Sequence, residues 1–311
     1  MSILTINLNT FKRITLNINQ LIILYTLRRR MKKILSMLAL LLIITGCITS
    51  SNESANTNNS LWTTDFFDDF DTFNKDNWQD QLLWVNDEYQ CYVRDNQYGT
   101  REVSNGTLKI KVINIGKKIP CDNFNKFGKQ QNDTQYVAGR IASKNRKEFI
   151  KGRWTARLKV ENSGQGGMFP AWWLLGAYNN EPPIEDTDET VCWPMTGSGE
   201  IDIFEHHSDG GPDHYAARAI KNGGKCGDGD WQALMLVQSA KLDEFHEYAV
   251  EFVGDDIIYR LDGKEVFRNE GQANEFPEPL FAILNFAKIN DMPMTGEWIM
   301  EVDWVKHEYL K

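Results

Sequence analysis

Short strands of alternating polarity are the feature that most constrains the fold of this 311-residue chain. The segment GTLKIKVI at 106–113 alternates Leu108, Ile110 and Val112 with two lysines, and GRWTARLKVE at 152–161 alternates in the same way. A period of two residues places alternate side chains on opposite faces of a strand. No long segment has the 3.6-residue period of an amphipathic helix. The pattern therefore predicts an all-β domain.

Segments nearer the C-terminus indicate how these strands connect. EYAVEFV and DDIIYRLDGKEVF are typical of a meander with a hairpin turn at Asp262-Gly263. LFAILNFA at 280–287 is almost entirely apolar, which suits a strand buried on both faces. The segment 297–310 is predicted to alternate four apolar residues with charged partners: Trp298, Met300, Val302 and Trp304. Many strands with few helices predict an antiparallel β-sandwich or jelly roll.

The N-terminal region has the layout of an export signal. Residues 31–47, MKKILSMLALLLIITGC, contain two lysines, a short apolar run and small residues before Cys47. The apolar run is too short for a helix to cross a membrane, which takes about 20 residues. The ending ITGC resembles a bacterial lipobox, so we expect Cys47 to carry a lipid anchor. The alternatives are an ordinary signal peptide cut nearby and a short uncleaved anchor.

Residues 1–30 add a second apolar patch and three arginines. We interpret Met31 as the true start of the leader, and a longer membrane-anchoring segment is the alternative. The predicted organisation is a leader at 1–47, a polar tether at 48–61 and one large all-β domain at 62–311. Localisation is expected to be exported, as a membrane-anchored lipoprotein on the periplasmic or cell-surface side, or as a secreted protein.

Charge narrows the range of partners. Residues 1–46 contain 7 of the 34 Lys and Arg and no Asp or Glu, so the remaining 27 basic and 43 acidic residues give about −16. This charge disfavours nucleic acid and anionic lipid surfaces as partners. We expect a monomer whose contact with a membrane is made through the lipid.

Four cysteines remain after Cys47, an even number in an exported chain. They are Cys91, Cys121, Cys192 and Cys226. Two disulfides are predicted, with all three connectivities open, and four free thiols are the alternative. No C-x-x-C pair is present, which disfavours a zinc site of the cysteine type.

The segment GEIDIFEHH at 199–207 places three carboxylates in a predicted strand. In a regular strand Glu200 and Asp202 share one face, and Glu205 would point into the core at a cost of several kcal/mol. A one-residue β-bulge near Ile203-Phe204 would return Glu205 to the face of Glu200. The alternative is an exposed acidic edge, which does not explain the three-residue interval.

This spacing suits acid–base chemistry on a sugar. Four ladder positions separate the two glutamate backbones by about 13 Å, and side chains leaning together would bring the carboxylates to about 5 Å. That separation is typical of a retaining glycosidase, whereas an inverting pair is about 6.5–9.5 Å apart. Glu200 is then the expected nucleophile and Glu205 the acid/base, with Asp202 positioning Glu200.

The same residues carry a family resemblance. GEIDIFEHH resembles the E-x-D-x-x-E signature of glycoside hydrolase family 16, in the β-bulge form typical of laminarinase-type endo-β-1,3-glucanases, agarases and carrageenases. The resemblance covers most of 62–311, including FFDDFDTFNKDNW, NDEYQCY, YVAGRIASKNRKEFIKGRWTARLKV, MFPAWWLLG and MEVDWVKHE. It implies a concanavalin A-like jelly roll with a concave substrate cleft, a polysaccharide substrate and no cofactor for catalysis.

The resemblance also implies roles for individual residues. It gives Glu200, Asp202 and Glu205 the roles inferred from their spacing. Four residues match positions around the sugar, with packing as the alternative: Asn86, Arg140, Trp173 and Trp193. Asp303 and the backbone of Gly106 match a structural calcium site.

Departures from the family pattern fall beside the expected cleft. WPMTGSGE has two extra residues before Gly199, Cys91 replaces a usual Tyr, and 179–192 and 221–231 are irregular insertions. The usual His after the acidic strand is not plainly matched, and His214 is the nearest candidate. The expected activity is endo-hydrolysis of β-1,3-glucan or mixed-linkage β-glucan with retention. Alternatives are a galactan-cleaving hydrolase (agarose, porphyran or carrageenan) and a sugar-binding jelly roll without catalysis.

Overall fold

The computed structural model describes residues 61–85, 88–230 and 236–311. The predicted leader, its Cys47, most of the tether and the predicted sugar-binding Asn86 lie outside the described residues. None of the helices in the described ranges combines the length and hydropathy that a membrane span needs.

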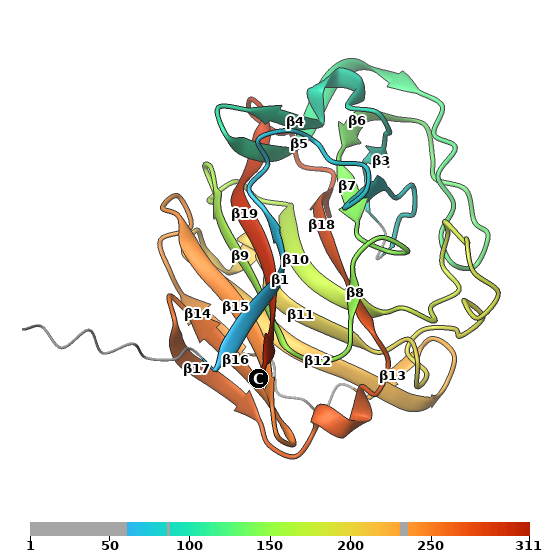
Figure 1. The fold of residues 1–311 in the computed structure, drawn as a ribbon. Coiled ribbons are helices and arrows are strands. Elements are labelled where there is room, and N and C mark those ends of the chain that lie inside the picture. The colour runs from blue at the N-terminus through green and yellow to red at the C-terminus, as the bar shows by residue number, and fades with distance from the viewer. Residues whose placement is uncertain (1–60, 86–87, 231–235) are drawn as a thin grey trace, which may run out of the picture. The chain divides into compact units, whose positions relative to one another are not determined.

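The described residues form two large, mostly antiparallel sheets (Figure 1). Sheet A, with ten strands in these ranges, comprises β1 (Trp62–Asp68), β3 (Cys91–Tyr92), β4 (Arg101–Ser104), β5 (Thr107–Ile119), β6 (Thr134–Ala138), β9 (Arg153–Val160), β15 (His246–Val253), β16 (Asp256–Leu261), β17 (Lys264–Asn269) and β19 (Trp298–Leu310). Sheet B, with nine, comprises β2 (Gln79–Asp80), β7 (Arg140–Ala142), β8 (Glu148–Phe149), β10 (Met168–Gly176), β11 (Glu200–Glu205), β12 (His214–Lys225), β13 (Asp228–Asp230), β14 (Leu236–Ser239) and β18 (Leu280–Lys288). Three 3-10 turns complete the described elements: η1 (Gln97–Gly99), η2 (Ser208–Gly210) and η3 (Ala273–Glu275).

One apolar core joins the two sheets. Trp154 of β9 and Trp172 of β10 are fully buried, and their rings meet edge to face with centroids 6.1 Å apart. Trp298 of β19 and Phe286 of β18 stack across the same core. Because inward-facing side chains of both sheets share this cluster, the predicted all-β sandwich is confirmed.

The predicted strands are found close to their expected bounds. The meander is β15–β16–β17, and Asp262 and Gly263 both have positive φ, 49° and 74°, as a two-residue hairpin turn of type I′ requires. All nine residues of β18 are buried, as the continuous apolar run predicted. This strand pairs with β10 on one side and with β7 and β8 on the other.

The prediction for the last strand is wrong at one position. The pairing of β19 with β9 shifts between Val302 and Trp304, so that one residue of β19 is extra. As a consequence Val305 is buried, while Trp304 is only partly buried and lies beside the exposed Phe67 with ring centroids 6.2 Å apart. A bulge therefore ends the alternation that placed Trp304 with Val302.

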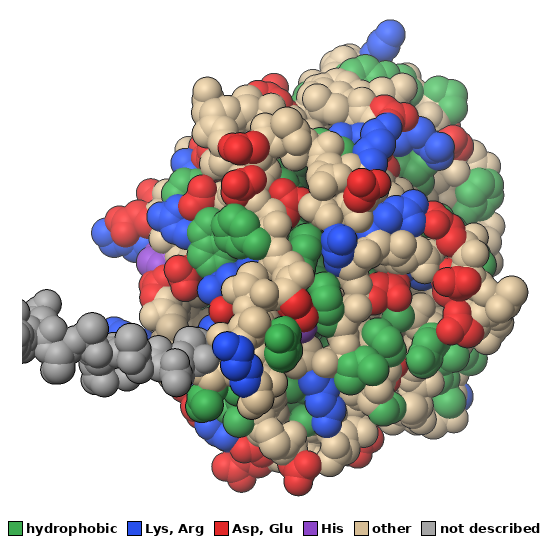
Figure 2. All heavy atoms as spheres, viewed as in Figure 1, with side chains coloured by type: hydrophobic (Ala, Val, Ile, Leu, Met, Phe, Trp, Pro, Cys, Tyr) green, Lys and Arg blue, Asp and Glu red, His purple; other side chains and the backbone are tan. Residues whose placement is uncertain are grey.

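On the face seen in Figure 2, acidic and basic side chains are interspersed with hydrophobic ones.

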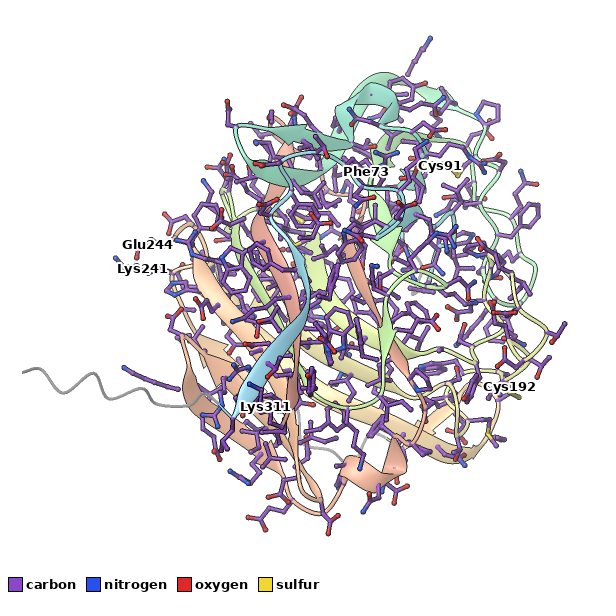
Figure 3. All side chains as sticks on the ribbon, viewed as in Figure 1. Phe73, Cys91, Cys192, Lys241, Glu244 and Lys311 are labelled. Carbon is purple, nitrogen blue, oxygen red and sulfur yellow. A yellow bond between two sulfur atoms is a disulfide. The ribbon has the colours of Figure 1, made fainter. Side chains whose placement is uncertain are left out.

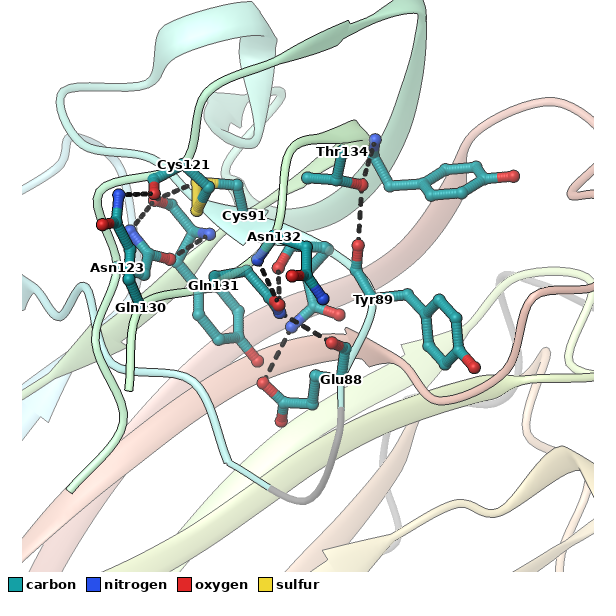
Figure 4. Close-up of a disulfide and its surroundings, with 12 residues drawn as sticks. Glu88, Tyr89, Cys91, Cys121, Asn123, Gln130, Gln131, Asn132 and Thr134 are labelled. Atoms are coloured by element: carbon teal, nitrogen blue, oxygen red, sulfur yellow. Dashed lines mark hydrogen bonds between the residues drawn. A yellow bond between two sulfur atoms is a disulfide. The ribbon is translucent and has the colours of Figure 1, made fainter. Parts of the chain in front are cut away.

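The four cysteines of the domain form two disulfides, Cys91–Cys121 and Cys192–Cys226. Cys91 and Cys192 are well separated in Figure 3, so the two bonds secure different loops. Figure 4 shows the first disulfide with the hydrogen bonds around it. There Gln131 Nε2 donates to the backbone oxygen of Glu88, which ties the loop that precedes β6 to the segment that leads into β3.

Candidate active site

The predicted bulge in the acidic strand is present. Along β10, Trp172 pairs with Phe204 while the next residue, Trp173, pairs with Asp202, so Ile203 has no position of its own in the ladder. On the other side, the four residues of β11 from Asp202 to Glu205 face only three residues of β12, from Arg218 to Ala216. The chain accommodates the three-residue interval by bulging at Ile203.

The bulge sorts the side chains of β11 as the sequence predicted. Ile201, Ile203 and Phe204 all belong to the apolar core. Glu200, Asp202 and Glu205 instead line one cavity of about 130 Å³. Asp202 and Glu205 are almost completely buried, with exposed fractions of 2% and 6%. Three carboxylates from six consecutive residues therefore face one small cavity.

Three of the predicted sugar-contacting residues line the same cavity: Arg140, Trp173 and Trp193. The Arg140 guanidinium is buried, donates from Nε to Gln81 Oε1 at 2.8 Å, and lies 5.1 Å from the centroid of the Trp173 ring. Trp173 donates from Nε1 to Asn285 Oδ1 at 2.7 Å. These contacts hold both side chains in fixed orientations at the cavity wall.

A lysine and two glutamates at the cavity were not singled out from the sequence. Lys126 lies at the tip of the loop between β5 and β6, and its Nζ is 3.8 Å from the centroid of the Trp193 ring. Glu88 and Glu181 are buried at the same cavity, and the latter comes from the acidic insertion at 179–192. No motif in the sequence marks Lys126 or Glu181, because both lie in irregular loops that only the fold brings together, whereas Glu88 lies within NDEYQCY, one of the segments that carry the resemblance.

Burial and crowding perturb the ionisation of the acidic cluster. Desolvation, together with the neighbouring Asp202, raises the pKa of Glu205 from 4.5 to about 8. Burial likewise raises the pKa of Asp202, and burial with two neighbouring carboxylates raises the pKa of Glu200. Asp202 is close enough to Glu200 that its negative charge contributes to the raised pKa of Glu200. The cluster therefore retains at least one proton near neutral pH.

Other charged groups at the cavity respond to the same burial. Desolvation raises the pKa of Glu88 to about 7, against the opposing effect of Arg140. It also raises the pKa of Glu181 and lowers the pKa of Lys126. The cavity thus disfavours charge of either sign, which is the environment that keeps a carboxylic acid protonated at neutral pH.

Arg218 of β12 is another residue at the cavity that was not singled out from the sequence. It pairs opposite Asp202 in the ladder, its Nε donates to Asp202 Oδ2 at 2.9 Å, and its Nη2 lies 3.0 Å from Glu205 Oε2. His214, the candidate suggested by the family pattern, does not line the cavity; its ring meets the buried His206 edge to face. A pattern that looked for a histidine could not point to an arginine four residues later.

The residues proposed for calcium make other contacts. The Asp303 carboxylate pairs with the Arg157 guanidinium, and Gly106 lies in the turn between β4 and β5 with φ of 71°. In the ranges that the structure describes, no group of three or more His, Cys, Asp and Glu side chains is arranged to hold a metal ion. An arginine beside Asp303 does not fit a cation site, and calcium binding there stays an untested prediction.

Comparison with known proteins identifies the fold. No family model matches the sequence, and no match is found among curated proteins. Among solved structures, LamAcat of Zobellia galactanivorans is 25% identical with a TM-score of 0.65, covering 79% of this chain and 97% of that chain. The laminarinase catalytic domain of Thermotoga petrophila is 20% identical with a TM-score of 0.62, covering 80% and 98%.

A third structure comes from work on endo-acting O-glycanases with which human gut bacteria initiate mucin breakdown. It is 22% identical with a TM-score of 0.65, covering 81% of this chain and 92% of that chain. A further match is an endo-β-1,3(4)-glucanase assigned to glycoside hydrolase family 16, at 20% identity and a TM-score of 0.61. The chain therefore has the laminarinase-like β-sandwich fold of glycoside hydrolase family 16.

Proposed function

We propose that this protein is an endo-acting glycoside hydrolase that cleaves β-1,3-glucan of the laminarin type, or mixed-linkage β-glucan, with retention. The observation that carries the proposal is the bulge at Ile203, which places Glu200, Asp202 and Glu205 together in one cavity. A purely sugar-binding sandwich would gain nothing from three crowded carboxylates, because burying them costs free energy.

The reaction follows from the order of the three acids. Glu200 attacks the anomeric carbon, while Glu205 gives its proton to the departing glycosidic oxygen. In the second half, Glu205 takes a proton from water as the water oxygen bonds to the anomeric carbon and the ester to Glu200 breaks. No metal or organic cofactor takes part in these steps.

Backbone pairing supports retention rather than inversion. Glu200 pairs with Leu175 and Glu205 with Ala171, which places them four ladder positions apart. At about 3.3 Å per position the backbones are about 13 Å apart, and two glutamate side chains leaning inward leave roughly 5 Å between carboxylates. Asp202 lies between the two glutamates on β11 and lines the same cavity, which supports it as the residue that orients Glu200.

The choice of glucan rests on the solved relatives and on the cavity wall. A laminarinase variant of Zobellia galactanivorans was crystallised with laminaritriose and laminaritetraose, at 24% identity to this chain. Trp173 and Trp193 offer aromatic faces at the cavity, and apolar faces of sugar rings pack well on such surfaces. Arg140 and Lys126 supply donors for sugar hydroxyls.

A polysaccharide panel tests the proposal. Residues 62–311 are incubated with laminarin, mixed-linkage β-glucan, agarose, porphyran and carrageenan, and new reducing ends are measured. We expect release from the two glucans and none from Glu200→Gln on any substrate. Activity on galactans alone would refute the proposal that glucan is the substrate. Binding of glucan by the wild type without release of reducing ends would refute the proposal of hydrolysis. Mucin O-glycans are added to the panel as a competing substrate, because one of the similar solved structures comes from work on O-glycanases that initiate mucin breakdown.

We also propose that the protein is an exported lipoprotein held by Cys47. The lipobox-like ITGC supports this, and the two disulfides support an oxidising compartment. Metabolic labelling with a palmitate analogue should mark the wild type and not Cys47→Ser. Equal labelling of both proteins would contradict the anchor.

A further inference from the structure

Arg218 forms a fixed positive centre between two acids of the candidate active site. Its Nε donates to Asp202 Oδ2 at 2.9 Å, and its Nη2 lies 3.0 Å from Glu205 Oε2. The Arg218 side chain is 21% exposed, while both carboxylates are under a tenth exposed. A planar guanidinium can reach two acceptors at once and stays charged at any pH that a protein survives.

The other charged groups near Glu205 come from several elements. Glu200 and Asp202 lie on the same strand, and His207 follows that strand, where its ring packs against Phe169 of β10. The residue of β10 opposite Glu205 is the uncharged Ala171. Four further charged residues line the same cavity, namely Glu88, Lys126, Arg140 and Glu181, and the charges of Lys126 and Glu181 act on Glu200. Among these groups, Arg218 is the cation in ion-pair contact with Glu205.

We propose that Arg218 is a positioning residue that holds Glu205 in place and favours its ionised form once the proton has been given away. This inference rests on the proposed function. When Glu205 protonates the leaving oxygen, it becomes a carboxylate beside two others, and the ion pair with Arg218 stabilises it. The same carboxylate must then accept a proton from water, so Arg218 supports the second half of the double displacement.

The electrostatic consequence has a definite direction. Burial and Asp202 raise the pKa of Glu205, and Arg218 opposes that rise. Without the guanidinium, the pKa of Glu205 should rise further, since an opposite charge at this distance lowers a carboxyl pKa by about one to three pH units. Glu205 would remain an acid to higher pH and would become a poor base.

Arg218→Gln is the direct test, with Arg218→Lys keeping the charge and Arg157→Gln as the control. Arg157 is also an ion-paired arginine on a strand, but it pairs with Asp303 away from the cavity. In Arg218→Gln, the alkaline limb of kcat/KM against pH should move upward by about one pH unit or more. kcat should fall about tenfold or more, and intact-protein mass spectrometry should detect accumulated glycosyl-enzyme. In Arg218→Lys the alkaline limb should lie between its positions in the wild type and in Arg218→Gln. Arg157→Gln should have the same pH profile and kcat as the wild type.

An alkaline limb that stays in place or moves downward in Arg218→Gln would overturn the proposal. If Arg218→Gln does not fold, Arg218→Lys decides the question, since a single ammonium cannot reach both carboxylates as the guanidinium does. A smaller upward movement of the limb is then expected, and a profile identical to the wild type in kcat and limb would refute the role.

A second readout separates this inference from the proposed function. The ionisation of Glu205 can be followed without turnover by ¹³C NMR of side-chain-labelled glutamate, assigned with Glu205→Gln. A raised Glu205 pKa in the Arg218 variant of a protein that cleaves no polysaccharide would refute hydrolysis and leave the electrostatic role standing. Hydrolysis by the wild type with an unchanged Glu205 pKa in the variant would refute the role of Arg218 alone.

Discussion

Replacing Glu205 with glutamine should make the stability of the protein less dependent on pH. Burial and Asp202 raise the pKa of Glu205 from 4.5 to about 8, so the folded state keeps a proton that the unfolded chain releases between those values. The folded state then binds more protons than the unfolded state, and stability falls as pH rises through this window. Below pH 4.5 both states are protonated, and the full stability is present.

The size of the effect follows from the same values. At about 1.36 kcal/mol per pH unit, the loss between pH 5 and pH 8 is at most about 3–4 kcal/mol. Glutamine cannot ionise, so Glu205→Gln should escape this loss. The difference in unfolding free energy between variant and wild type is measured at both pH values. Subtracting one difference from the other cancels any effect of the substitution on stability that does not depend on pH.

Urea unfolding followed by circular dichroism at pH 5, 6, 7 and 8 measures the effect. We expect the stability of Glu205→Gln relative to wild type to increase by about 1–4 kcal/mol from pH 5 to pH 8. Glu270→Gln, at an exposed turn after β17, serves as the matched control. Parallel stability curves for wild type and Glu205→Gln would refute the account of a buried, proton-retaining acid.

Three further predictions concern the triad, the core and the second disulfide. Glu200→Gln should lower kcat at least about 10³-fold on laminarin with an unchanged circular-dichroism spectrum, and a loss below tenfold would exclude it as nucleophile. Trp172→Ala, in the fully buried contact with Trp154, should reduce the free energy of unfolding by about 3–5 kcal/mol; a loss below 1 kcal/mol would contradict that packing. Replacing Cys192 and Cys226 together with serine should cost about 3 kcal/mol and raise KM more than it lowers kcat, because Trp193 adjoins the disulfide. An unchanged KM would show that the disulfide does not position the cavity wall.

The sequence was most informative where physical conflict was greatest. A regular strand would have buried Glu205 among isoleucines, and that cost alone predicted the bulge at Ile203. In β19 the bulge after Val302 creates no such conflict, because a tryptophan is tolerated on either face. The alternation therefore gave no warning that Trp304 faces outward beside Phe67.

Long-range contacts could not be predicted in the same way. The partners of Cys91 and Cys192 depend on which loops the sheets bring together, and spacing along the chain leaves every pairing open. Arg218 lies in AARAI, an ordinary alternating segment of β12, and its meaning appears only when β12 pairs with β11. Lys126 likewise reaches the cavity from a loop without any recognisable motif.

The stereochemistry of the first product tests the central claim most directly. ¹H NMR of laminarin hydrolysis, recorded within the first minutes, distinguishes the two anomers of the new reducing end before mutarotation mixes them. Double displacement through Glu200 predicts that the β-anomer forms first and the α-anomer appears later. An initial α-anomer would mean inversion by a single displacement, and the roles assigned here to Glu200 and Glu205 would be wrong.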